Sequence, residues 1–233
     1  MNFVGTSGWS YDHWVDKFYP EGLERNKWLE FYSENFNTVE INMSFYRFPF
    51  KNMVKGWVNK TPEGFLFFLK ANRQITHVRK LKNISQLVKK FDKLAVLLGE
   101  KLGGVLYQLP PSLHFDLEKL EKFLSILPER RNVIEFRHTS WFCNETIKLL
   151  NKYKIIFCVV SAPKLPEMVK KSTNEIYVRF HGREWYRYDY TKKELKNWAQ
   201  QIKRLKPKNT FIYFNNDFNA YAVKNAKTMK CLI

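Results

Sequence analysis

The sequence is poor in cysteine, and its three cysteines, Cys143, Cys158 and Cys231, are widely spaced and form no C-x-x-C pair. This odd number excludes a disulfide framework, and the spacing excludes a zinc site built from adjacent thiolates. Reduced thiols are typical of the cytoplasm, so we expect a cytoplasmic protein. Cys158 lies in an apolar run, which predicts a core position rather than a nucleophile.

Long apolar runs and common catalytic motifs are also absent. No stretch of about 18 uncharged apolar residues occurs, so no transmembrane helix is expected, and the first residues, MNFVG, do not form a secretory signal. There is no G-x-S-x-G or H-E-x-x-H motif among the 233 residues. The sequence requires no cofactor, although a divalent-ion site built from Glu40, Glu135, His181 and Asp217 stays open.

Basic residues are abundant. Lysine and arginine number 40 against 22 acidic residues, a formal net charge of +18. Such a charge attracts anionic partners, either small molecules or nucleic acid. The basic pairs are scattered through predicted helices rather than gathered in a tail, so a solubilising coat is the open alternative. Nothing in the sequence indicates an oligomeric state.

Strand and helix patterns alternate along the whole chain, and no linker or break in composition divides residues 1–233. Runs rich in β-branched and aromatic residues predict strands, whereas apolar residues at helical spacing predict helices. The predicted strands are Phe3–Gly8, Thr38–Asn42, Leu66–Lys70, Gly104–Gln108, Val133–Arg137, Ile155–Val160, Ile176–His181 and Thr210–Asn215. The predicted helices are Lys27–Asn35, Ile84–Leu98, Leu117–Leu127, Asn144–Lys152, Thr191–Leu205 and Ala220–Met229.

Eight strands alternating with helices predict a single α/β domain, a (β/α)₈ TIM barrel with a parallel eight-stranded sheet. The connection Ser161–Asn174 contains Pro163 and Pro166 and is expected to lack a full helix. An open doubly wound sheet is the competing fold. It is disfavoured because the dinucleotide fingerprint is missing and Trp9 stands where a phosphate loop needs a small residue.

Polar residues occur at the C-terminal ends of the predicted strands, where the active sites of such barrels gather. Residues two apart on a strand share a face, so Glu135 and Arg137 point the same way. A Glu135–Arg137 or Glu40–Lys70 salt bridge that merely fills the barrel is the open alternative for single residues. The candidate catalytic residues are Glu40, Glu135 and His181, and the candidate substrate-binding residues are Asn42, Tyr46, Lys70, Gln108, Arg137, Trp141, Arg179 and Asn215.

Several ordered motifs resemble those of the YecE-like family, a long-standing domain of unknown function with a TIM-barrel fold. They span nearly the whole chain: GTSGW (5–9), VEIN (39–42), QLPP (108–111), EFRH (135–138), YVRFHG (177–182) and YFNN (213–216). The sequence departs from the pattern at Ser161, where the resemblance leads us to expect an acidic residue. If that acid is catalytic in other members, this protein differs from them in its chemistry or lacks it. The resemblance implies no established reaction.

Three functions remain open, and an enzyme is favoured. The leading hypothesis is hydrolase-type acid–base chemistry on an anionic, phosphate-bearing substrate such as a nucleotide or nucleic acid. Lys70, Arg137 and Arg179 would hold the anion, Glu135 or Glu40 would be the general base, and His181 the general acid. The first alternative is a glycosidase-like pair, Glu40 and Glu135, with aromatic sugar platforms. The second is nucleic-acid binding without chemistry.

Overall fold

A computed structural model describes all 233 residues, and its parallel strands form a nearly closed barrel. The sheet has eight strands in the order β1-β9-β7-β6-β5-β4-β3-β2. An isolated parallel bridge between Ser7 and Glu40 holds the ends of the two edge strands, β1 and β2, together. The strands are β1 (Asn2–Thr6), β2 (Thr38–Ile41), β3 (Leu66–Lys70), β4 (Leu102–Gln108), β5 (Asn132–Glu135), β6 (Ile156–Ser161), β7 (Glu175–Phe180) and β9 (Asn209–Phe214). The predicted TIM barrel is confirmed.

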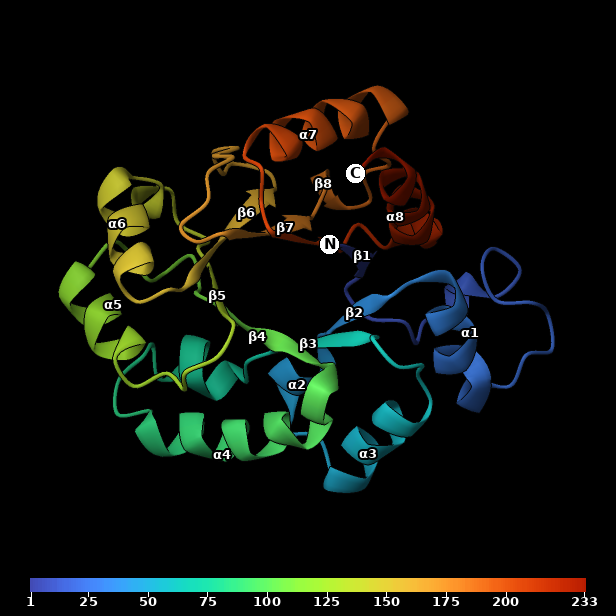
Figure 1. The fold of residues 1–233 in the computed structure, drawn as a ribbon, viewed down its shortest axis with the longest axis horizontal. Helices are drawn as coiled ribbons and strands as arrows, with labels where there is room; N and C mark the ends of the chain where they lie inside the picture. Colours follow the sequence, from blue (N-terminus) through green and yellow to red (C-terminus); the bar gives the residue numbers. More distant parts are fainter.

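Helices cover the outside of this ring (Figure 1). They are α1 (Trp28–Asn35), α3 (Lys51–Asn59), α4 (Ser85–Ala95), α5 (Leu117–Leu124), α6 (Asn144–Lys152), α7 (Lys192–Arg204) and α8 (Tyr221–Leu232), while the short α2 (Met43–Tyr46) directly follows the end of β2. All six expected helices are present, but α2 and α3 were not predicted. The segment between β6 and β7 has no helix, as its prolines indicate. None of the helices is long and apolar enough to cross a membrane.

Several short elements near the strand ends also lie outside the sequence prediction. A 3-10 helix, Asp12–Trp14, follows β1, and a π-helix, Gln74–Val78, follows β3. A short exposed strand, β8 (Arg183–Tyr186), follows β7 and is not part of the barrel sheet.

Alternation along the strands produces two apolar layers. Side chains that point outward pack against the helices in a cluster of 52 buried residues. Those that point inward fill the lower barrel, in a cluster of nine that includes Phe68, Cys158, Tyr177 and Tyr213. Cys158 is therefore a core residue, as predicted, and all three cysteines are free. The polar side chains inside the barrel lie beyond the inner cluster, at the C-terminal ends of the strands.

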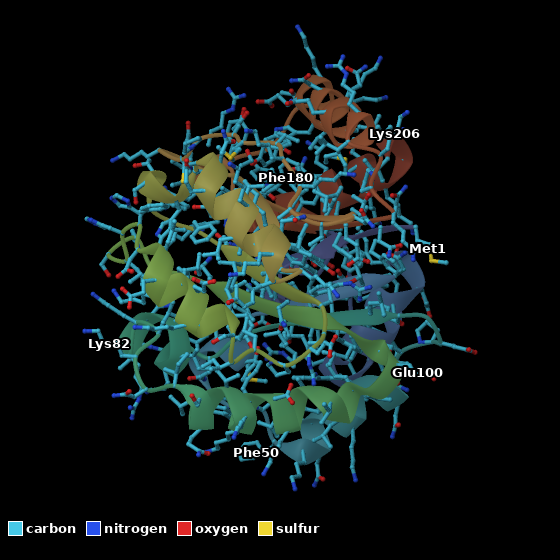
Figure 2. All side chains as sticks on the ribbon, turned by 60° about the vertical axis from the view of Figure 1, so that its left-hand side comes forward. Met1, Phe50, Lys82, Glu100, Phe180 and Lys206 are labelled. Carbon is cyan, nitrogen blue, oxygen red and sulfur yellow. The ribbon has the colours of Figure 1, made fainter.

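The two ends of the barrel are separated in Figure 2. Met1, Glu100 and Lys206, which precede β1, β4 and β9, lie on one side of the molecule. Lys82, from the loop that follows β3, lies on the opposite side. The loops after the strands thus share the face that carries the candidate residues, called the mouth below.

Candidate functional site

The centre of the mouth is an ion network in which one arginine joins two glutamates. Tyr177, Arg179 and His181 alternate along β7 and its end, and therefore all point into the barrel. Arg179 Nη2 lies 2.6 Å from Glu40 Oε1, and Arg179 Nη1 lies 2.5 Å from Glu135 Oε2. The sequence correctly places these residues at one end of the barrel.

Both carboxylates are enclosed and fully hydrogen-bonded. Glu40 also accepts hydrogen bonds from Ser7 Oγ at 2.7 Å and from the Tyr177 hydroxyl at 2.6 Å. Glu135 accepts from Gln108 Nε2 at 3.0 Å and from Arg137 Nη1 at 2.7 Å. Neither glutamate side chain has solvent exposure. The Glu135–Arg137 ion pair considered from the sequence thus forms, whereas Glu40 pairs with Arg179 instead of Lys70.

His181 lies beside this network as a neutral imidazole. Its Nε2 is 3.1 Å from Glu135 Oε1 and 3.0 Å from Arg137 Nη1, and its Nδ1 is 3.1 Å from Asn215 Nδ2. Burial and then Arg179 lower the pKa of His181 to about 3. Burial raises the pKa of Glu135, but Arg179, His181 and Arg137 hold it well below its ordinary value. At neutral pH this pair therefore offers an ionised glutamate and an uncharged ring.

A group of basic side chains occupies the β3–β5 side of the mouth. Lys70 Nζ lies 4.2 Å from the centre of the Phe45 ring and makes no ion pair, because the nearby glutamates are bonded to Arg179 and Arg137. Burial and then Arg179 lower the pKa of Lys70 to about 7. Burial, then Lys70, Arg73 and Arg137, lower the pKa of His77 to about 4. We call Lys70, Arg73, His77 and Arg137 the basic cluster.

The π-helix after β3 positions two members of the basic cluster. It begins after Arg73 and contains His77, whose ring meets Phe45 edge-on at 4.8 Å. Asn72 fixes the start of this turn, since its Oδ1 accepts from Gln74 N at 3.0 Å and its Nδ2 donates to Ser44 O at 3.1 Å. Single π-helical turns are rare and are frequently found at functional sites.

Two pockets open at the β1–β2 and β9 side of the mouth. A pocket of about 420 Å³ is lined mainly by aromatic and methionine side chains, among them Trp9, Trp57 and Tyr46, together with Asn42. A second pocket, of about 600 Å³, includes Tyr11, His13, Asn215 and Asp217. Asn42 Nδ2 lies 3.5 Å from Asn215 Oδ1, so the two pockets meet at this pair of amides.

Two residues singled out from the sequence are enclosed by the protein and cannot contact a ligand at the mouth. Trp141 is 1% exposed, stacks on Phe136 and donates its Nε1 hydrogen to Leu113 O at 2.7 Å. It thus presents no free ring face to a ligand, and the prediction of Trp141 as a substrate-binding residue is wrong. Ser161 is also enclosed, and its Oγ accepts from the Tyr190 hydroxyl at 2.8 Å. Ile156, Cys158 and Val160 of β6 belong to the inner cluster, so Ser161 points outward and away from the mouth.

The structure adds site residues to which the sequence analysis gave no role. Ser7 and Tyr177 complete the shell around Glu40, and Arg73 and His77 complete the basic cluster. Tyr177 could have been found, because it precedes Arg179 by two residues and shares its face. His77 had no such signal, since its position depends on the π-turn. No group of three or more histidine, cysteine or acidic side chains is arranged to hold a metal ion, because Arg179 lies between the two glutamates.

Comparisons with known proteins agree with this architecture. Residues 3–233 match the family model described as "Protein of unknown function DUF72". The UPF0759 protein YunF of Bacillus subtilis is 32% identical over 98% of this chain and 93% of its own length. The UPF0759 protein YecE of Escherichia coli is 31% identical over 65% of this chain and 54% of its own length. The resemblance identified from the motifs is therefore confirmed.

Solved structures extend the comparison to the fold. A DUF72 family protein from Thermotoga maritima has a TM-score of 0.91 and 33% identity, covering 99% of this chain and 98% of its own. A GH5 cellulase from an Icelandic hot spring isolate has a TM-score of 0.51 and 10% identity, covering 91% of this chain and 73% of its own. The cellulase likeness is one of fold alone, because barrels of this kind support many chemistries.

Proposed function

Because the chain belongs to the DUF72 family, whose function is unknown, its activity must be argued from the site, and we propose an enzyme that acts on an anionic, phosphate-bearing substrate bound at the mouth. The observation that carries this proposal is that Lys70 in the basic cluster has no ion-pair partner, because Arg179 and Arg137 already bind both glutamates. A phosphate group is the ligand that several converging Lys and Arg donors bind best.

The charges at the mouth show why an anion is favoured. Glu40 and Glu135 balance Arg179 and Arg137, which leaves the charge of Lys70 without a partner. Arg73 adds a further positive charge beside it, close enough to affect His77. A partly buried cation without a counter-ion is costly, and a bound anion would reduce that cost. The ligand would therefore bind where the protein alone leaves the charge unbalanced.

Specific roles follow from the contacts. Lys70 and Arg137 are the anion-binding groups, because Lys70 is unpaired and Arg137 is partly exposed, at 16% of its side chain. Arg179 is a positioning residue, since both of its terminal nitrogens are bonded to glutamates. Asn42 and Asn215, where the two pockets meet, are suited to orient the rest of the ligand.

The glycosidase alternative has less support. It needs one carboxylate to reach the sugar and another to donate a proton. In this barrel both glutamates are enclosed and bonded to Arg179, and Arg137 contacts Glu135 as well. For the same reason we assign neither Glu40 nor Glu135 as the general base in the phosphate reaction.

Isothermal titration calorimetry with phenyl phosphate tests the proposal. We expect binding in wild type and at least tenfold weaker binding in Lys70→Met and Arg137→Met. Lys206→Met, on the opposite face of the barrel, is the matched control and should bind normally. A bound anion raises the pKa of Lys70, so binding near pH 7 should take up about half a proton, measured from buffers of different ionisation enthalpy.

Turnover of bis(p-nitrophenyl) phosphate, with and without Mg²⁺, tests the enzymatic part. Hydrolysis that is lost in Lys70→Met would support it. Failure of phenyl phosphate to bind, or equal binding by wild type and Lys70→Met, would overturn the proposed site.

A further inference from the structure

An exposed histidine and a nearly buried aspartate line the second pocket, apart from the ion network. His13, in the 3-10 helix after β1, has its Nε2 3.2 Å from Oδ2 of Asp217, which follows β9. The His13 side chain is 45% exposed and that of Asp217 is 15% exposed. The pocket of about 600 Å³ also includes Tyr11, Tyr186 and Asn215.

The geometry fixes which ring nitrogen of His13 is free. His13 Nε2 also lies 2.8 Å from the backbone carbonyl oxygen of Asp217. A carbonyl oxygen can only accept a hydrogen bond, so Nε2 must carry the ring hydrogen. The neutral ring then has its lone pair on Nδ1, and no protein group bonds to this nitrogen. A histidine that is oriented by a carboxylate through one nitrogen and free at the other is the arrangement of a general base.

The carboxylate is held firmly in place. The buried Trp14 donates its Nε1 hydrogen to Asp217 Oδ1 at 2.7 Å, while Oδ2 faces His13. Burial raises the pKa of Asp217 to about 6, against the lowering effect of Trp14 and His13. The carboxylate is therefore mainly ionised at pH 7 and can stabilise an imidazolium.

The backbone is strained just after Asp217. Asn219 and Ala220 have φ values of 57° and 61°, both in the left-handed region. Such a conformation is costly for alanine, and strained backbone of this kind clusters at functional sites. Lys17 Nζ donates to Asn219 Oδ1 and ties this turn to the loop after β1.

We propose that His13 is a general base for a hydroxyl group or water molecule bound in this pocket, and that Asp217 is the residue that orients it. The base would remove a proton from the O–H group with its Nδ1 lone pair. The O–H electron pair would form the new bond to phosphorus, the bond to the leaving oxygen would break, and that oxygen would take the proton from Nδ1.

The phosphorus electrophile in this step rests on the proposed function, whereas the assignment of the base does not. The pocket adjoins Asn215, which also contacts His181 in the centre of the mouth. A ligand in this pocket would therefore lie beside Asn215, on the side of the mouth next to His181. His181 cannot take this role, because it is enclosed and both of its nitrogens are engaged.

Nitrogen-15 NMR of histidine-labelled protein tests the assignment without a known substrate. The chain has five histidines, and His13→Gln identifies the His13 signals. We expect the neutral His13 ring to carry its hydrogen on Nε2, and its Nδ1 signal to shift when phenyl phosphate is added. A ring with its hydrogen on Nδ1 would overturn the proposal. So would an Nδ1 signal that stays unchanged although calorimetry shows phenyl phosphate to be bound, an outcome that leaves the proposed function intact.

Absence of phenyl phosphate binding would instead count against the proposed function, and the position of the hydrogen alone would then decide the His13 assignment. Where bis(p-nitrophenyl) phosphate is hydrolysed, His13→Gln should lower kcat about 100-fold or more with KM unchanged. Glutamine can still donate to the Asp217 carbonyl oxygen, so the unfolding temperature should also stay the same. A variant with wild-type kcat would contradict a role as base.

Discussion

At the scale of single residues, Arg179 balances two glutamates that have no access to water. Removing one member of a buried ion network leaves an uncompensated charge, which costs more than the network itself contributes. The residues that stabilise the mouth are thus different from those that can bind a ligand. Arg179 belongs to the first kind and Lys70 to the second.

Arg179→Met should lower the free energy of unfolding by about 3–5 kcal/mol, because Glu40 and Glu135 would lose their shared cation. Urea unfolding monitored by circular dichroism measures this loss. Lys122→Met is the control: Lys122 Nζ lies 2.5 Å from Glu118 Oε1, but these side chains are 75% and 80% exposed. The control should lose almost no stability, and equal losses in both variants would contradict the distinction.

Lys70→Met should be more stable than wild type at pH 7. The unfolded chain protonates Lys70 below about pH 10.4, whereas burial lowers its pKa to about 7 in the folded protein. Wild type therefore loses stability as the pH falls from about 10 to 7, and methionine removes this loss. Urea unfolding at several pH values should show a difference that shrinks towards pH 10. A variant less stable than wild type at pH 7 would contradict the unpaired state of Lys70.

At the scale of elements, the seam between β1 and β2 depends on one residue without a side chain. A Cβ atom at Gly5 would lie 2.2 Å from the Thr38 carbonyl oxygen and 2.9 Å from the Tyr32 hydroxyl. Glycine here allows the two backbones to approach closely, beside the Ser7–Glu40 bridge. The first glycine of the GTSGW motif is therefore explained by closure of the barrel.

Gly5→Ala should accordingly lower the free energy of unfolding by about 3 kcal/mol, because a backbone atom must move to admit the methyl group. Gly56→Ala is the control, since Gly56 lies within α3 with nothing within 4 Å of the added carbon. Alanine is the better helix former, so this variant should gain about 0.5–1 kcal/mol. Thermal unfolding compares them, and a stable Gly5→Ala protein would refute the account of the seam.

Sequence patterns predicted those elements whose side chains have a clear period. The strands have inward and outward faces, and for this reason Glu40, Glu135 and Arg179 could be assigned to one end of the barrel before their contacts were known. The helix α3 has a buried face that includes Val54 and Trp57, but Gly56 lies within it and Pro49 precedes it closely, and these two residue types disfavour a helix. The π-turn that contains His77 depends on a backbone bond pattern that residue spacing does not encode. The sequence also could not show that Arg179, rather than Lys70, pairs with Glu40, because this depends on distances across the barrel.

At the scale of the whole molecule, the charge of +18 acts over a far larger surface than the mouth. Exposed lysines and arginines attract any polyanion, and salt screens this attraction within about 10 Å at 0.1 M. The buried charges of the mouth are screened much less. Attraction by the surface charge and binding at the mouth can therefore be distinguished by their dependence on salt and by the residues responsible for each.

A double variant, Lys70→Met with Arg137→Met, distinguishes a site for small anions from a surface for nucleic acid. Retention of duplex DNA driven by the overall charge should weaken at least about tenfold between 50 and 200 mM NaCl, and equally in wild type and the double variant. Phenyl phosphate binding should survive the added salt in wild type and be lost in the double variant. Fluorescence anisotropy and calorimetry on the same preparations measure the two ligands. If the double variant lost DNA and phenyl phosphate together, the mouth itself would be the nucleic-acid site, because the interaction would then depend on Lys70 and Arg137 rather than on the exposed lysines and arginines.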